Sequence, residues 1–201
     1  MKLFLIGGRP CSGKTTLSFQ LGRKHNIHVE HLDLFAQGCI NQSTENYPNM
    51  YRWKVADLVE LLQKESGKLF SDYLKIYEEM LPFLLKAIDV SEKKELILEG
   101  SILLPKFVEM FKKNHDVKIC YLLTDDAFAR ERYFSRDYVQ NMLNKPNGKK
   151  ALNNLLLRDS LFSGYINDEI KKFALPKIVI HAYDDVEKNL KRLEVALEME
   201  E

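Results

Sequence analysis

The stretch "GGRPCSGKTT", residues 7–16, constrains the fold of this chain more than any other part of the sequence. It follows a compact apolar run, residues 3–6, which has the length and composition of a buried strand. It leads into residues 15–25, where Leu17 and Leu21 are spaced for one face of a helix. A glycine-rich loop in this position lets successive backbone N–H groups point inward at a helix N-terminus, where anions bind.

The loop fits the pattern G-x-x-x-x-G-K-[ST] of a phosphate-binding loop. The pattern predicts that Lys14 contacts the β- and γ-phosphates of a nucleotide and that the Thr15 hydroxyl ligates Mg²⁺. A glycine-rich turn with a chance lysine is the alternative, and the flanking strand and helix argue against it. The predicted nucleotide-binding residues are Gly8, Arg9, Pro10, Cys11, Ser12, Gly13, Lys14, Thr15 and Thr16.

Apolar strands alternate with helical segments along the rest of the chain. Further strands are predicted at residues 27–32, 95–99, 117–123 and 177–181. This alternation indicates an α/β protein with a parallel sheet and helices on both faces. We expect residues 1–201 to form a single domain. Two finer expectations are that residues 34–51 are irregular and that residues 125–143 form one helix, capped by Thr124 or Asp125.

Composition and charge exclude several classes of protein. The chain is 45% hydrophobic with a formal net charge of +1, so no strong basic field points to nucleic acid, although a local basic groove remains open. Three widely spaced cysteines argue against a disulfide framework and for a reducing compartment. No apolar run has the length of a membrane span or of a signal-peptide core. We therefore expect a cytoplasmic protein without a membrane partner, whose oligomeric state is left open.

Other motifs narrow the class of nucleotide-binding protein. The D-x-x-G switch of GTPases is absent, and residues 144–147 read N-K-P-N where the GTPase base reader has N-K-x-D, which favours ATP over GTP. The L-S-G-G-Q signature of transporter ATPases is absent too. Over most of its length the chain resembles the P-loop small-molecule kinases, the nucleoside monophosphate, shikimate and uridine kinase group. A shorter likeness, "EGSILLP" at residues 99–105, is to 2-phosphoglycerate kinase-like proteins.

The resemblance implies a specific architecture. This is the three-layer αβα P-loop NTPase fold, with a five-stranded parallel sheet in the order 2-3-1-4-5. It also implies a short lid at residues 130–150. The long helical insertion at residues 34–94 departs from the monophosphate kinases, and we expect it to bind the acceptor. ATP and Mg²⁺ are the cofactors that the resemblance implies.

Two carboxylates follow predicted strands. Asp33 ends "HLD" and Glu99 ends "LILE". The resemblance implies that Asp33 contacts the acceptor hydroxyl as a general base, or holds Mg²⁺ through water, and that Glu99 binds a metal-coordinated water. The carboxyl ends of neighbouring parallel strands are where such folds bind ligands. The alternatives are a loop-capping aspartate and an ordinary strand end.

The sequence "RYFSR" places two arginines, Arg132 and Arg136, four residues apart. The resemblance implies that Arg132 stacks on the adenine and that Arg136 reaches the transferred phosphoryl group. The spacing predicts that both guanidinium groups lie on one face of the helix over residues 125–143. A solvated helix face, with Glu131 and Asp137 as ionic partners, is the alternative.

Three further arginines are candidate substrate-binding residues, although the sequence patterns around them are less specific. Arg52 lies beside Tyr47 and Trp53 at the start of the insertion, where it suits a phosphorylated or aromatic acceptor, although packing and surface charge explain it equally well. Arg158 is a further lid arginine by resemblance, and the role of Arg130 stays open.

Together these features predict an ATP- and Mg²⁺-dependent kinase that acts on a small-molecule acceptor, a nucleoside, a nucleotide or a hydroxylated metabolite. A kinase of nucleic-acid ends is one alternative, and it requires a basic groove. A nucleotide-binding regulator with little transfer activity is the other. The pairing of Asp33 with Glu99 argues against the regulator, because a protein that only binds nucleotide needs one metal carboxylate.

Overall fold

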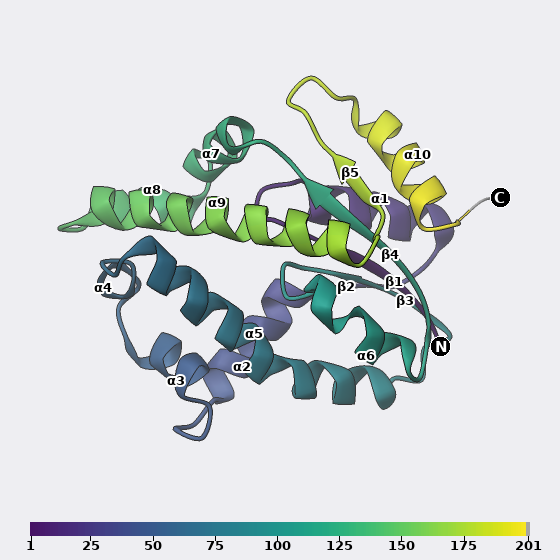
Figure 1. Cartoon of the computed structure of the whole chain (residues 1–201), viewed down its shortest axis with the longest axis horizontal. Coiled ribbons are helices and arrows are strands. Elements are labelled where there is room, and N and C mark those ends of the chain that lie inside the picture. Colours follow the sequence, from purple (N-terminus) through teal and green to yellow (C-terminus); the bar gives the residue numbers. More distant parts are fainter. Residues whose placement is uncertain (200–201) are drawn as a thin grey trace. The chain divides into compact units, whose positions relative to one another are not determined.

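The computed structural model, in which residues 1–199 are described, contains a five-stranded parallel sheet (Figure 1). Its order is β2-β3-β1-β4-β5, which confirms the predicted order. In β1, Ile6 lies opposite Glu99 of β3 and Cys120 of β4. Because all pairs are parallel, the carboxyl ends of β1, β2 and β3 lie at one edge of the sheet. The strands are β1 (Lys2–Gly8), β2 (Val29–His31), β3 (Glu95–Glu99), β4 (Asp116–Leu123) and β5 (Lys177–Val179).

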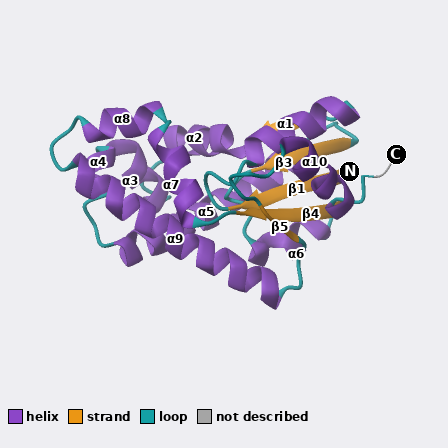
Figure 2. Ribbon diagram, turned by 90° about the horizontal axis from the view of Figure 1, so that it is seen from above, coloured by secondary structure: helices purple, strands orange, loops and turns teal. Residues whose placement is uncertain are grey.

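Helices cover both faces of this sheet. Helices α1 (Lys14–His25) and α10 (Val186–Ala196) pack together on one face, and the 3₁₀ turn η1 (Pro105–Phe107) and α6 (Val108–Lys112) lie on the other (Figure 2). Phe4 and Ile6 of β1 belong to the core beneath α1 and α10. Leu3 and Leu5 alternate with them and are also fully buried. A strand buried on both sides needs the continuous apolar run that the sequence shows.

The chain divides into two compact units. The first, residues 1–33, 91–129 and 163 onward, contains the sheet. The second, residues 34–90 and 130–162, is helical in secondary structure. Helices α2, α7 and α9 cross the boundary between the units. The helices that lie wholly or partly in the second unit are α2 (Leu32–Gln42), α3 (Pro48–Val55), α4 (Leu58–Leu61), α5 (Ser66–Asp89), α7 (Asp126–Phe134), α8 (Asp137–Leu143) and α9 (Gly148–Lys172).

The expectation of an irregular segment over residues 34–51 is wrong. Helix α2 occupies most of the first part of this segment, and α3 begins at Pro48, a residue suited to the first helical turn. Of the residues that suggested a loop, Gly38 and Asn41 lie inside α2, and Asn46 lies between the two helices.

The single helix expected over residues 125–143 is also wrong, because Arg136 has an extended backbone (φ −94°, ψ 131°) and separates α7 from α8. Two side chains replace the helical partners of the last carbonyls of α7. The Ser135 hydroxyl donates to the Arg132 carbonyl (2.9 Å), and the Gln140 amide donates to the Phe134 carbonyl (2.8 Å). The start was predicted correctly, since the Asp125 carboxylate accepts from the Phe128 N–H (2.7 Å).

None of the helices within residues 1–199 is long and apolar enough to cross a membrane.

Candidate active site

The loop between β1 and α1 has the backbone that an anion site requires. Gly8, Cys11 and Gly13 have positive φ angles of 127°, 62° and 85°. A Cβ on Gly8 would lie 2.0 Å from the Leu122 carbonyl oxygen, so only glycine fits there. Gly13 is the N-cap of α1 and supplies no side-chain cap. The first N–H groups of α1 are therefore not occupied by a capping side chain.

Arg9 and Ser12 stabilise the loop through their side chains. The buried Arg9 guanidinium donates to the Thr124 carbonyl (3.0 Å) and to the Asp126 carboxylate (2.6 Å) beyond the end of β4. The Ser12 hydroxyl donates to the Arg9 carbonyl (2.9 Å). Because the Arg9 guanidinium is hydrogen-bonded to these groups, we expect Arg9 to contact a bound phosphate through its backbone N–H and not through its side chain.

Lys14 lies folded over the loop that it follows. Its ammonium group donates to the Arg9 carbonyl (2.8 Å) and lies 3.4 Å from the Ser101 hydroxyl, just after β3. The side chain is buried, so its positive charge is concentrated at the loop rather than screened by solvent.

Thr15, Glu99 and His31 converge on one point at the carboxyl ends of the strands. The Thr15 hydroxyl donates to Oε1 of Glu99 (3.1 Å), and Nδ1 of His31 lies 2.9 Å from the same oxygen. The Glu99 side chain is buried. His31 was not singled out as a site residue, although the predicted order places β2 beside β3, and His31 is paired with Glu99 in their register.

These groups fit a magnesium ion. A hydroxyl and a carboxylate oxygen are hard ligands of the kind that Mg²⁺ prefers. Within residues 1–199, no three His, Cys, Asp or Glu side chains are grouped to hold a metal by themselves. Mg²⁺ usually keeps several waters and binds one or two protein ligands together with substrate phosphates.

Asp33 lies in the first turn of α2 rather than at the end of a strand. It is exposed, and it follows by two residues His31, which contacts Glu99. Its carboxylate is therefore accessible to solvent.

Arg132 and Arg136 do not share a helix face, which corrects the inference from their spacing. Arg132 lies on α7, and Arg136 is the N-cap of α8. Both side chains are exposed, and the Arg136 guanidinium lies 5.6 Å from the centre of the Tyr133 ring. The four-residue spacing of Arg132 and Arg136 therefore does not show that the two side chains act on the same ligand.

Arg158 is buried inside the second unit. Its guanidinium lies 2.5 Å from the Asp159 carboxylate and 4.1 Å from the centre of the Tyr73 ring. The Tyr133 hydroxyl donates to the other oxygen of Asp159. Burial alone lowers the pKa of Arg158, but Asp159, Tyr73 and Tyr133 together outweigh it and raise the pKa above its ordinary value. Arg158 therefore stays charged and joins α9 to α5, while Asp159 joins α9 to α7.

Arg52 belongs to a cluster of cations around Asp72. The Asp72 carboxylate lies 2.8 Å from Lys64, 3.3 Å from Lys68 and 3.4 Å from Arg52. Burial alone raises the pKa of Asp72, but the hydrogen bonds and charges of Lys64 and Lys68 together outweigh it and lower the pKa below its usual value. Three cations against one carboxylate leave a local excess of positive charge.

Comparison with known proteins finds similarity in structure rather than in sequence. No protein-family model matches the sequence, and no curated protein gives a significant match. Deoxyadenosine kinase from M. mycoides is 15% identical, with 100% of both chains covered and a TM-score of 0.54. A gluconokinase from Sinorhizobium meliloti is 11% identical over 98% of this chain and 92% of its own (TM-score 0.54). Shikimate kinase from Bacteroides thetaiotaomicron is 16% identical over 98% of both chains (TM-score 0.50). The chain therefore has the fold of the P-loop small-molecule kinases.

Proposed function

We propose that this protein is an ATP- and Mg²⁺-dependent kinase that transfers the γ-phosphoryl group to a small-molecule acceptor. The observation that carries the proposal is the contact of Thr15 with the buried Glu99, directly after the Lys14 loop. A phosphate loop alone is compatible with binding, whereas a loop with a hydroxyl–carboxylate pair beside it supplies what phosphoryl transfer needs, positioning and charge neutralisation.

Each residue has a distinct part in the proposed reaction. The loop N–H groups and Lys14 hold the β- and γ-phosphates, and Thr15 and Glu99 hold Mg²⁺, directly or through water. Bound Mg²⁺ would offset negative charge on the phosphate oxygens. His31, through its contact with Glu99, orients that carboxylate.

Asp33 would orient the acceptor hydroxyl and accept its proton. The acceptor oxygen then bonds to the γ-phosphorus as the bond between that phosphorus and the bridging oxygen breaks, leaving ADP. Arg132 and Arg136 remain candidates for contacts to the adenine and to the transferred group. Arg52, with the surplus charge around Asp72, is a candidate for contact with an anionic acceptor.

From the same features, we propose that the acceptor is a nucleoside, a nucleotide or a small hydroxylated metabolite. The test is a screen for transfer of labelled γ-phosphate from ATP to nucleosides, nucleoside monophosphates, hydroxy acids, sugars and short oligonucleotides. A labelled small molecule is the expected product. Labelling of the oligonucleotides alone, with steep salt dependence, would instead identify a kinase of nucleic-acid ends.

A further inference from the structure

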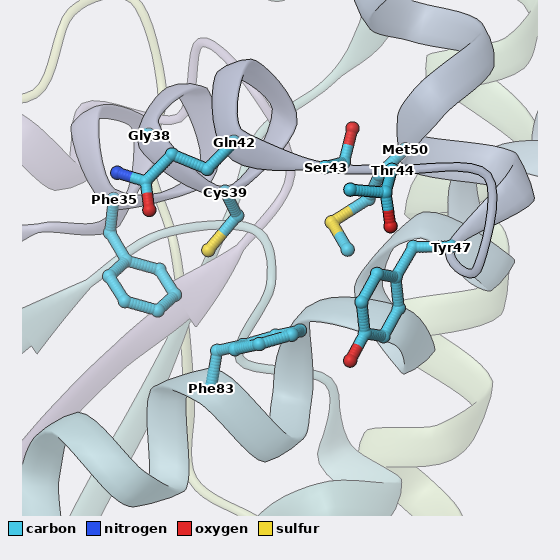
Figure 3. Close-up of a pocket in the computed structure, with 9 residues that line it drawn as sticks. All are labelled: Phe35, Gly38, Cys39, Gln42, Ser43, Thr44, Tyr47, Met50 and Phe83. Atoms are coloured by element: carbon cyan, nitrogen blue, oxygen red, sulfur yellow. The ribbon is translucent and has the colours of Figure 1, made fainter.

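The second unit contains a cavity of about 400 Å³ that is lined only by residues from its segment 34–90. Three aromatic rings contribute to its walls, those of Phe35, Tyr47 and Phe83, together with the Cys39 thiol and the Met50 thioether (Figure 3). The volume lies in the range of small-molecule pockets, which are mostly apolar with a few placed polar groups.

One face of α2 forms a large part of this cavity. Phe35, Gly38, Cys39 and Gln42 recur at the spacing i, i+3, i+4 and i+7, which places them on the same side of the helix. The Phe83 ring comes from α5, and Tyr47 packs edge-to-face against it with ring centres 5.1 Å apart.

Gly38 is a glycine that the fold does not need. It lies inside α2 without a positive φ angle, and a Cβ added to it would meet no atom within 4 Å. Glycine in a helix interior costs about 1 kcal/mol relative to alanine. The residue thus leaves space on the cavity side of α2 at some cost to the helix.

The lining defines the chemistry of an occupant. None of the lining residues is charged, so the part of a ligand that enters is uncharged. Aromatic walls favour a planar ring. The Gln42 side chain makes no hydrogen bond to another residue in the described part of the chain, and Figure 3 shows its amide extending beside Phe35 and Cys39. It offers one donor edge and one acceptor.

We propose that this cavity binds the uncharged planar ring of a heteroaromatic small molecule, held against Phe35 and Phe83 and hydrogen-bonded to the Gln42 amide.

The helix geometry separates this ligand from the acceptor at Asp33. Nine residues separate Asp33 from Gln42, about two and a half helical turns, so the two side chains lie on opposite faces of α2. A ligand in the cavity therefore contacts the face of α2 opposite to Asp33. The cavity is a second binding site, one that does not depend on the phosphate loop.

Cys39 provides the readout. It is partly exposed, whereas Cys11 and Cys120 are buried. Burial raises the pKa of the Cys39 thiol, so its alkylation by iodoacetamide is measured at mildly alkaline pH and located by mass spectrometry. The probes are nicotinamide, hypoxanthine, indole and quinazolin-4-one at millimolar concentrations. At least one is expected to slow Cys39 alkylation about fivefold or more at saturation.

Two glutamines on α2 form a matched pair. Gln42→Ala removes the amide at the cavity and is expected to raise the half-protecting probe concentration about tenfold, the effect of one lost hydrogen bond. Gln37→Ala removes an exposed amide that contacts Asn41 and is expected to leave protection unchanged.

Gly38→Leu fills the cavity without opposing the fold, because the helix gains a better helix former. We expect a melting temperature no lower than that of the wild type, and no further slowing of Cys39 alkylation by the probe. Lys14→Ala, which removes the phosphate-site cation, is expected to keep full protection. The proposal is overturned if no probe protects the wild type, if Gly38→Leu is protected like the wild type, if the two glutamine variants weaken protection equally, or if Lys14→Ala abolishes protection.

Discussion

Thr15 and Glu99 show how much of the candidate site depends on single residues. Thr15 is marked by the phosphate-loop pattern, whereas Glu99 only ends an apolar strand. The pairing of β1 with β3 brings them within hydrogen-bonding distance, and His31 contacts the same carboxylate oxygen. The phosphate loop thus lies beside a hydroxyl and a carboxylate that contact each other.

Glu99→Gln keeps the shape of this side chain and removes its charge. If Glu99 holds Mg²⁺, the variant should bind ATP in EDTA as the wild type does but lose the gain in affinity that Mg²⁺ gives, at least about tenfold. Isothermal titration with and without Mg²⁺ measures this. Glu95→Gln, on an exposed residue of the same strand, is the matched control and should behave as the wild type. An unchanged Mg²⁺ effect in Glu99→Gln would remove Glu99 from the metal site.

Gly8→Ala tests the backbone of the loop. The added Cβ would meet the Leu122 carbonyl at 2.0 Å, at a φ angle that non-glycine residues rarely adopt. We expect a fall in stability of about 2 kcal/mol or more, measured by urea unfolding, and loss of measurable ATP binding. Gly67→Ala, on an open helical position where the nearest atom is 3.7 Å away, should be neutral or stabilising. Full nucleotide affinity in Gly8→Ala would contradict the described loop geometry.

Among the elements, the central strands were the most predictable from sequence and the helices after β2 and β4 the least. Strand β1 is buried on both faces, and its short continuous apolar run is the pattern that predicts such a strand. The break at Arg136 depends on Ser135 and Gln140, whose side chains bind backbone carbonyls and compete with the helix. Periodicity does not contain that information, so the arginine pair was assigned to a shared face that does not exist. Helix α2 was missed because its exposed polar residues resemble those of a loop.

Helices α1 and α10 are joined by an ionic cluster that should depend on pH. Glu194 contacts Lys24 and His25. Burial alone raises the pKa of Glu194, but these two partners outweigh it and lower the pKa below the usual value of 4.5. A carboxylate with a lowered pKa in the folded state contributes stability that is present above pH 4.5 and lost as the pH falls through the folded-state pKa.

Glu194→Gln should therefore be less stable than the wild type at neutral pH. The difference in melting temperature should shrink as the pH falls below about 4.5. Glu95→Gln again serves as the control, with no difference across the range. A Glu194→Gln penalty that stays constant down to pH 3 would contradict this role of the ion pairs.

For the whole molecule, the sequence led to the P-loop kinase fold and to the strand order, both of which the structure confirms. It did not reveal the cavity beside Gly38, because a cavity depends on which faces of α2 and α5 meet, and that is a property of tertiary packing. The cavity is lined by helical side chains of the second unit that belong to no sequence motif.

The most direct test of phosphoryl transfer is the rate at which labelled γ-phosphate moves from ATP to the best acceptor in three proteins: wild type, Lys14→Ala and Asp33→Asn. The proposed function predicts that the wild type transfers the label and that Lys14→Ala loses at least about a hundredfold in rate. Asp33→Asn should retain ATP binding but lose about a hundredfold or more in transfer. If the wild type gave only slow hydrolysis, unaffected by any acceptor and unchanged in Asp33→Asn, the protein would be a nucleotide-binding regulator and not a kinase.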